Sequence, residues 1–178
     1  INIMKKFSVK KYNNGLKSVI IPLSGIMSFT LYVIIKTGSV NEHKKINGGS
    51  HFIEHMFFKG TSNRNNSSKI TEDLDKIGAS YNAFTSKEIT GYHIKADSSH
   101  IKHVFDVLSD MLYNSLFYEK EMELEKKVVI DEIRGYYDDP LSFLLDKFEE
   151  SFFKNHNLSR NVGGEEKDIL NYNREDII

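Results

Sequence analysis

Short runs of alternating or continuous apolar residues predict β-strands in the first half of the chain. Each run is rich in β-branched and aromatic side chains and is bounded by turn-forming residues. The first run contains the pair Asn14-Gly15, which favours a two-residue hairpin turn, so this run is expected to hold two strands. The predicted strand regions are 9–23, 29–38, 80–85 and 89–96.

Longer segments repeat apolar residues every three or four positions, which predicts amphipathic helices. The first would begin at about Ser50, a residue that caps helices well, and would end at Lys59-Gly60. The last begins at Asp139-Pro140, because proline is tolerated at the first helical position. Its apolar face consists of Leu141, Leu144, Leu145, Phe148 and Phe152. The predicted helices span about 50–58, 70–77, 99–114, 119–137 and the segment from 140 onward.

Strands therefore come first along the chain, followed by a helix, a hairpin and further helices. This order indicates an α+β fold, in which helices pack on one face of a largely antiparallel sheet. The chain has 178 residues, of which 39% are apolar, so it is long enough for one domain with a substantial core. No internal repeat or low-complexity linker divides residues 1–178.

One uncharged segment, residues 18–35, has the length of a membrane span. However, Pro22, Ser24 and Gly25 interrupt its middle, and its flanks are rich in valine, isoleucine, phenylalanine and tyrosine. Two buried strands around a turn explain this segment better, so no membrane span is expected.

Composition restricts the chemistry that the chain can perform. A formal net charge of −1 gives no reason to expect a nucleic-acid partner. The chain has no cysteine, which excludes a disulfide framework and a thiolate metal site. Any transition metal would therefore have to be held by histidine and carboxylate side chains.

The predicted helix at 50–58 carries a compact group of such side chains. His51 and His55 are four residues apart and so share one helix face, with Glu54 beside them. Two imidazoles at this spacing can hold Zn²⁺, but a catalytic site also needs a third protein ligand and an open position. The pentapeptide alone is equally compatible with a chance pairing of surface histidines. The other histidines, at 43, 93, 100, 103 and 156, read as ordinary surface or half-buried residues.

Glu132 is the best candidate for the third ligand. It lies in a helical segment whose neighbours are largely apolar, where a carboxylate is costly unless it is paired or binds a metal. Glu125 lies two helical turns earlier on the same face, where it could orient one of the ligands. A solvated helix position remains the alternative for Glu132.

H-x-x-E-H is the inverted zincin signature, and it stands here within GGSHFIEHMFFKGT. Three further blocks follow it in order: IGASYNAFTSKEITGYHIKA, EKKVVIDEIRGYYDDP and GGEEKDILNYNREDI. Together the four blocks resemble the pitrilysin, insulysin and mitochondrial processing peptidase family. The third is similar to the block that carries that family's third ligand, and the fourth to a later part of the same domain.

The resemblance implies a role for each matching residue. His51, His55 and Glu132 would be the zinc ligands, Glu54 the general base for the attacking water, and Glu125 the supporting glutamate. The resemblance also implies that the zinc-binding helix packs against the sheet and that one strand pairs with the backbone of an extended peptide substrate. The residues of that strand are Asn82, Ala83 and Phe84, with Phe84 flanking the pocket beside the scissile bond.

The expected function is that of a zinc-dependent endopeptidase module acting on extended peptides. The resemblance implies a second homologous half or partner subunit, and the chain is expected to be truncated at the C-terminal end of this catalytic domain. A catalytically silent peptide-binding subunit and a structural metal or scaffold domain remain alternatives, and a homo-oligomer remains open. The location stays open too: cytoplasmic is favoured for a bacterial protein, and a mitochondrial or other organellar location for a eukaryotic one.

Overall fold

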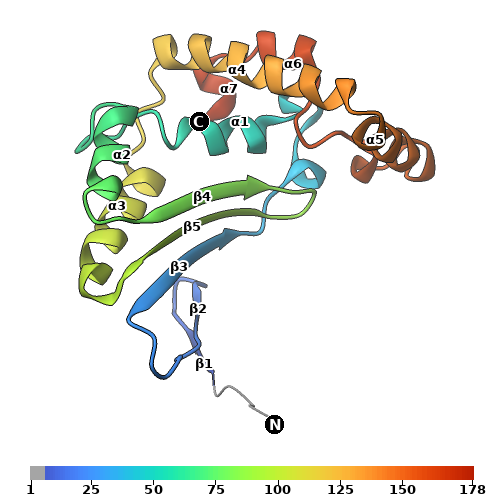
Figure 1. Ribbon diagram of the computed structural model, residues 1–178. Coiled ribbons are helices and arrows are strands. Elements are labelled where there is room, and N and C mark those ends of the chain that lie inside the picture. The colour runs from blue at the N-terminus through green and yellow to red at the C-terminus, as the bar shows by residue number, and fades with distance from the viewer. Residues whose placement is uncertain (1–6) are drawn as a thin grey trace.

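Two antiparallel sheets are formed by five strands in a computed structural model that describes residues 7–178 (Figure 1). One sheet is the hairpin of β1 and β2, as predicted, but its turn consists of Asn13, Asn14 and Gly15 and is therefore longer than the predicted two-residue turn. The other has the order β3-β5-β4, so that β4 and β3 are its edges. The bounds are β1 Ser8–Lys11, β2 Lys17–Ile20, β3 Ser28–Ile35, β4 Ser80–Thr85 and β5 Thr90–Asp97.

The helices lie on one side of the three-stranded sheet, which confirms the predicted α+β class (Figure 1). Helices α1, α2 and α3 contact the sheet, and α4 packs on α1 from the other side. No helix in residues 7–178 is long and apolar enough to cross a membrane. The bounds are α1 Gly49–Met56, α2 Ser67–Asp75, α3 Ile101–Tyr113, α4 Glu119–Asp138, α5 Pro140–Phe152, α6 Glu166–Leu170 and α7 Arg174–Ile177. Short 3₁₀ turns lie at η1 Ser39–Asn41, η2 Lys44–Ile46, η3 Ser98–His100 and η4 Asn157–Ser159.

Two clusters of buried side chains hold α1 between the sheet and α4. The first joins the sheet to α2 and α3, and the second joins α1 to α4 and α6. The first consists of Ile70, Leu74, Tyr92, Ile94, Ala96, Val104, Val107, Leu108 and Met111. The second consists of Phe52, Met56, Met122, Val129, Ile130, Ile133, Ile169 and Tyr172. Because α1 contributes to the second cluster while Phe57 and Phe58 just after it pack on the first, its position is fixed from both sides.

The start of α1 differs from the sequence prediction. Ser50 is not the N-cap: it lies inside the helix, and Gly48 occupies the cap position with a φ of 89°. The buried carboxylate of Glu42 accepts hydrogen bonds from the backbone N–H groups of Gly48 and Ser50, both at 2.7 Å. A negative charge at this end also complements the helix dipole. Glu42 therefore replaces the local cap that the sequence predicted.

The apolar face of α5 does not pack against the rest of the described chain. The five apolar side chains that the periodicity assigned to this face are 56–69% exposed. The helix contacts α4 and the 3₁₀ turn η4 and lies at one end of the molecule (Figure 1). The helix itself was predicted correctly, and Asp139 caps it by accepting a hydrogen bond from the N–H of Ser142.

Candidate metal centre

The three side chains predicted to bind a metal converge between α1 and α4. His51 and His55 lie one turn apart on α1, and their Nε2 atoms are 3.2 Å apart. Glu132 reaches them from α4, with one carboxylate oxygen 3.7 Å from His51 Nε2 and the other 3.4 Å from His55 Nε2. Within residues 7–178, these are the only three histidine, aspartate or glutamate residues grouped closely enough to hold one ion.

The spacing of these atoms fits a zinc ion. Zinc bonds of ~2.0–2.1 Å at tetrahedral angles place neighbouring ligand atoms about 3.4 Å apart. The three separations in the structure, 3.2, 3.4 and 3.7 Å, lie close to that value. Two imidazole nitrogens and one carboxylate also match the donor set of a catalytic zinc site, in which the fourth position is left for water or substrate.

Burial keeps the ring of His51 in the neutral form that can bind a metal. Its side chain is 13% exposed, and burial together with the neighbouring His55 lowers the pKa of His51 to about 4. The ring is therefore neutral near pH 7, which is the form that binds metals. Its Nδ1 atom is buried without a hydrogen-bond partner.

A buried carboxylate orients His55. Nδ1 of His55 lies 2.8 Å from Oε1 of Glu125, whose side chain is 4% exposed. If Nδ1–H donates to this carboxylate, the lone pair of Nε2 points toward the other ligands. Burial by itself would lower the pKa of His55, but the hydrogen bond and the negative charge of Glu125 outweigh it and raise that pKa.

Lys59 completes this arrangement, and the sequence did not reveal its role. Its Nζ atom lies 2.5 Å from Oε2 of Glu125. Burial would raise the pKa of Glu125, but the bonds to His55 and Lys59 outweigh it, so that pKa is lowered. Glu125 therefore stays ionised although it is buried. The sequence suggested only that Lys59 is a cation at the end of the helix.

Glu54 lies next to the ligands but belongs to a different set of contacts. Its Oε2 atom accepts a hydrogen bond of 2.5 Å from the hydroxyl of Thr85, the last residue of β4. Burial raises the pKa of Glu54, and the bond from Thr85 partly opposes this shift. Glu54 is thus held beside the centre by the sheet, while Glu132 joins the centre from α4.

The predicted substrate strand is an edge of the sheet. Strand β4 pairs with β5 on one side only, and its burial alternates, so that Asn82 and Phe84 are exposed while Ala83 and Thr85 are half-buried. The backbone N–H of Ala83 donates to Oδ1 of Asn82 at 2.9 Å, so this N–H group points toward the free edge. The side chain of Asn82 therefore occupies a donor that a paired peptide would use.

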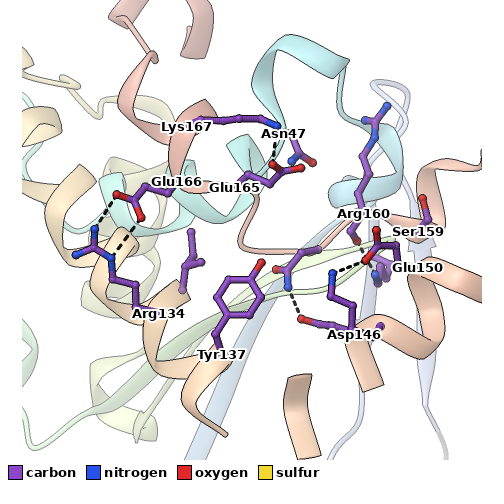
Figure 2. Close-up of a pocket in the computed structure, with 14 residues that line it drawn as sticks. Asn47, Arg134, Tyr137, Asp146, Glu150, Ser159, Arg160, Glu165, Glu166 and Lys167 are labelled. Carbon is purple, nitrogen blue, oxygen red and sulfur yellow. Dashed lines mark hydrogen bonds and ion pairs between the residues drawn. The ribbon is translucent and has the colours of Figure 1, made fainter. Parts of the chain in front are cut away.

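A cavity of about 600 Å³ lies elsewhere, between α4, α5 and the segment before α6 (Figure 2). Charged side chains of both signs line it, including the ion pair of Arg134 with Glu166 and the hydrogen bond that Asn161 donates to Asp146. None of the predicted site residues lines this cavity. This cavity is therefore separate from the candidate metal centre.

An H-x-x-E-H helix completed by a glutamate from a second helix, on this α+β fold, defines the class of inverted-motif zinc metallopeptidases. Comparison with known protein families supports this class. The profile described as Insulinase (Peptidase family M16) matches residues 25–166. The chain therefore belongs to peptidase family M16, the insulinase family.

Three relatives illustrate this membership. The chain is 40% identical to the uncharacterised zinc protease YmxG of Bacillus subtilis, over 95% of this chain and 42% of that protein. It is 33% identical to the β subunit of the mitochondrial-processing peptidase of Mus musculus, over 93% of this chain and 33% of that one. A protease from Helicobacter pylori has the same fold, with a TM-score of 0.91 and 28% identity over 98% of this chain and 42% of its own. The chain thus spans less than half the length of these relatives.

Proposed function

We propose that this chain is the metal-binding part of a zinc endopeptidase that hydrolyses extended peptides. The observation that carries the proposal is the convergence of His51, His55 and Glu132 at zinc-ligand spacing, with a separate glutamate, Glu54, beside them. A site that held a metal only for structure would need no such additional carboxylate. Membership of family M16 and the zinc-protease names of relatives support the same class of activity.

Each residue would have one task in this reaction. His51, His55 and Glu132 would hold the zinc ion, and Glu125 would keep the ring of His55 in its binding orientation. Zinc bound there would supply a Lewis acid that polarises the scissile carbonyl and makes water acidic enough to react near neutral pH. Glu54 would accept the proton from the attacking water and return it to the leaving nitrogen.

The edge of β4 would hold the substrate. An extended peptide can pair with the free backbone groups of β4, which reads the peptide backbone more than its side chains. Because Ala83 and Thr85 are half-buried on β4 and Thr85 bonds to Glu54, this edge runs beside the proposed base. Asn82 would release the N–H of Ala83 when the peptide binds, and exposed Phe84 would contact a substrate side chain.

We further propose that full activity needs polypeptide outside these 178 residues. The chain spans 42% of the Bacillus subtilis relative and 33% of the mouse processing peptidase subunit. In the described part of the chain, the metal centre lies beside an open sheet edge, where a peptide has support from one side. Correct positioning can contribute roughly 7–11 kcal/mol to lowering a reaction barrier, so a second wall would matter greatly.

A catalytically silent peptide-binding subunit is the second candidate. Its supporting observation is the free edge of β4, which suffices to bind a peptide without cleaving it. The presence of both Glu54 and the complete ligand set argues against this alternative, because a subunit that only binds needs neither.

One experiment separates these functions. The full-length protein, purified without added metal, is analysed for zinc and assayed with quenched-fluorescence peptides, with and without a chelator. Chelator-sensitive cleavage that is lost in Glu54→Gln supports the peptidase. Peptide binding without cleavage, with zinc present, would instead favour the silent subunit.

A further inference from the structure

Strand β4 contacts the candidate base directly. The hydroxyl of Thr85 donates to Oε2 of Glu54 at 2.5 Å, and both side chains are partly buried. Glu54 belongs to α1 and Thr85 to the sheet, so this bond links two separate elements. The bond uses one carboxylate oxygen of Glu54 and leaves Oε1 for another partner.

The end of β4 that carries Thr85 is firmly anchored. The carbonyl groups of Ser86 and Lys87 accept hydrogen bonds from the backbone N–H groups of Ser39 and Val40, at 3.3 and 2.8 Å. The Nζ atom of Lys87 donates to the carbonyl groups of Leu158 and Arg160 near η4, at 3.1 and 2.6 Å.

Two further contacts keep this corner in place. Lys87 also forms an ion pair of 2.8 Å with Glu149 of α5. Thr90, which pairs with Thr85 across the hairpin, donates its hydroxyl to the carbonyl of Thr37 at 2.9 Å. A Cβ atom at Gly38 would collide with the backbone of the hairpin, so the two segments touch without a side chain between them. Thr85, which donates to Glu54, therefore lies next to a β4–β5 turn that is held in place by several contacts.

We propose that Thr85 is the positioning residue of the general base, fixing the carboxylate of Glu54 relative to the strand that holds the peptide. The proposal rests on the function proposed above for Glu54 and for the edge of β4. Thr85 lies two residues beyond Ala83, whose N–H faces the free edge. One strand thus carries both the backbone that would align the peptide and the hydroxyl that orients the base.

This arrangement has a mechanistic consequence. A carboxylate with free rotation about its side-chain bonds would spend much of its time in unproductive orientations. With Oε2 held by Thr85, Oε1 keeps one direction, so proton transfer needs no search for the correct rotamer. The hydroxyl makes no contact with the metal ligands, so its loss should slow the reaction without releasing zinc.

The test compares variants of the full-length protein in kcat, KM and zinc content. Thr85→Val removes the hydroxyl and keeps the shape, while Thr85→Ser keeps the hydroxyl. Thr30→Val, at an exposed position on β3, is the matched control. Because hydrogen bonds to charged groups are the stronger ones, we expect Thr85→Val to lower kcat about tenfold with KM changed less than about twofold. Thr85→Ser should retain most of the activity, and zinc content should equal that of the wild type.

A double variant separates positioning from a structural role. If Thr85 acts through Glu54, adding Thr85→Val to Glu54→Gln should lower the residual activity no further. Unchanged kcat in Thr85→Val, or an additive loss in the double variant, overturns the proposal. If Thr85→Val does not fold, as judged by circular dichroism, loss of kcat in folded Thr85→Ser, whose hydroxyl is intact, would also contradict it.

Failure of the underlying function gives a different pattern. Should Glu54→Gln cleave peptides as fast as the wild type, Glu54 is not the base and the proposed function is wrong. Should Glu54→Gln be inactive while Thr85→Val cleaves at the wild-type rate, only the role of Thr85 is wrong.

Discussion

Nδ1 of His55 lies 2.8 Å from Oε1 of Glu125, and this contact determines which ring nitrogen is presented to a metal. Glu125 is itself fixed by Lys59 at 2.5 Å, so the ring of a proposed ligand is held by an ion pair between a buried carboxylate and a half-buried lysine. A carboxylate buried to this degree would be unfavourable without both partners.

Replacing Glu125 by glutamine should therefore weaken zinc binding without removing a ligand. The amide keeps the shape but loses the charge, and it leaves the half-buried Lys59 without its counter-ion. We expect about a 10–100-fold loss of zinc affinity, as is usual for the partner of a metal-binding histidine. Competition with a chromophoric chelator measures the affinity. Glu123→Gln, an exposed position on the same helix, is the control and should bind zinc as the wild type does.

Single substitutions should distinguish the metal ligands from the base, because they should affect different measured quantities. His55→Ala removes a donor from the group of three, and Glu132→Gln replaces a charged donor by a neutral amide oxygen, so zinc content should fall in both. Glu54→Gln should keep its zinc and lower kcat by ~10²–10⁴, the usual contribution of a general base. Elemental analysis and peptide assays on the same preparations measure both quantities. Near-complete zinc loss in folded Glu54→Gln would mean that the two glutamates have exchanged roles.

Local patterns in the sequence predicted much of this fold. The hairpin at Asn14-Gly15, the strand pair around residues 86–88 and helix α5 all depend on short-range signals: turn residues, alternation and helical periodicity. The grouping of His51 with His55 also follows from their spacing within one helix. Glu132 required more, because periodicity does not say which helix faces which. Its apolar neighbours made Glu132 the best candidate, and the resemblance to a family supported its pairing with the two histidines.

Other contacts between distant segments could not be predicted from the sequence. Nothing local distinguishes Thr85 from other strand threonines, and its bond to Glu54 exists only because β4 passes beside α1. Ser50 has the side chain of an N-cap, but Glu42 reaches the helix start from the preceding loop and takes that function. Similarly, periodicity identified the apolar face of α5 but did not reveal that this face is exposed.

The ion pairs of a buried arginine should make the free energy of unfolding fall at low pH. Arg64 forms ion pairs with Asp110 of α3 at 2.8 Å and with Asp73 and Asp106. Burial would raise the pKa of Asp110, but hydrogen bonds from Thr61 and other donors, Arg64 among them, lower it below its usual range. The folded protein thus holds this proton less tightly than the unfolded one. The stabilisation is complete above the unfolded value of about 3.9 and is lost as the pH falls below it.

Asp110→Asn tests this directly and has a matched control. The side chain of Asp110 is 3% exposed, whereas that of Asp106 is 66% exposed, although both contact Arg64. We expect Asp110→Asn to lower the free energy of unfolding by about 2–3 kcal/mol at pH 7. Asp106→Asn should cost less than about 1 kcal/mol, as exposed ion pairs do. Urea unfolding at pH 7 and below pH 4 measures both. Equal losses in the two variants would contradict the importance of burial here.

Gly91 lies under Phe84, and this contact offers a test of the proposed substrate strand. A Cβ atom at Gly91 would overlap the ring of Phe84, so Gly91→Ala should force the ring away from the sheet. A change of one methylene group in an apolar pocket typically changes the discrimination between two substrates by about 10–200-fold. We therefore expect Gly91→Ala to alter the preference for the substrate residue beside the scissile bond. Zinc content should not change, since neither residue contacts a ligand. Gly135→Ala on α4, where a Cβ meets open space, is the control and should leave cleavage unaffected. Peptides that differ only at that residue measure the preference by kcat/KM, and an unchanged preference in zinc-bound, folded Gly91→Ala would show that Phe84 does not contact the substrate.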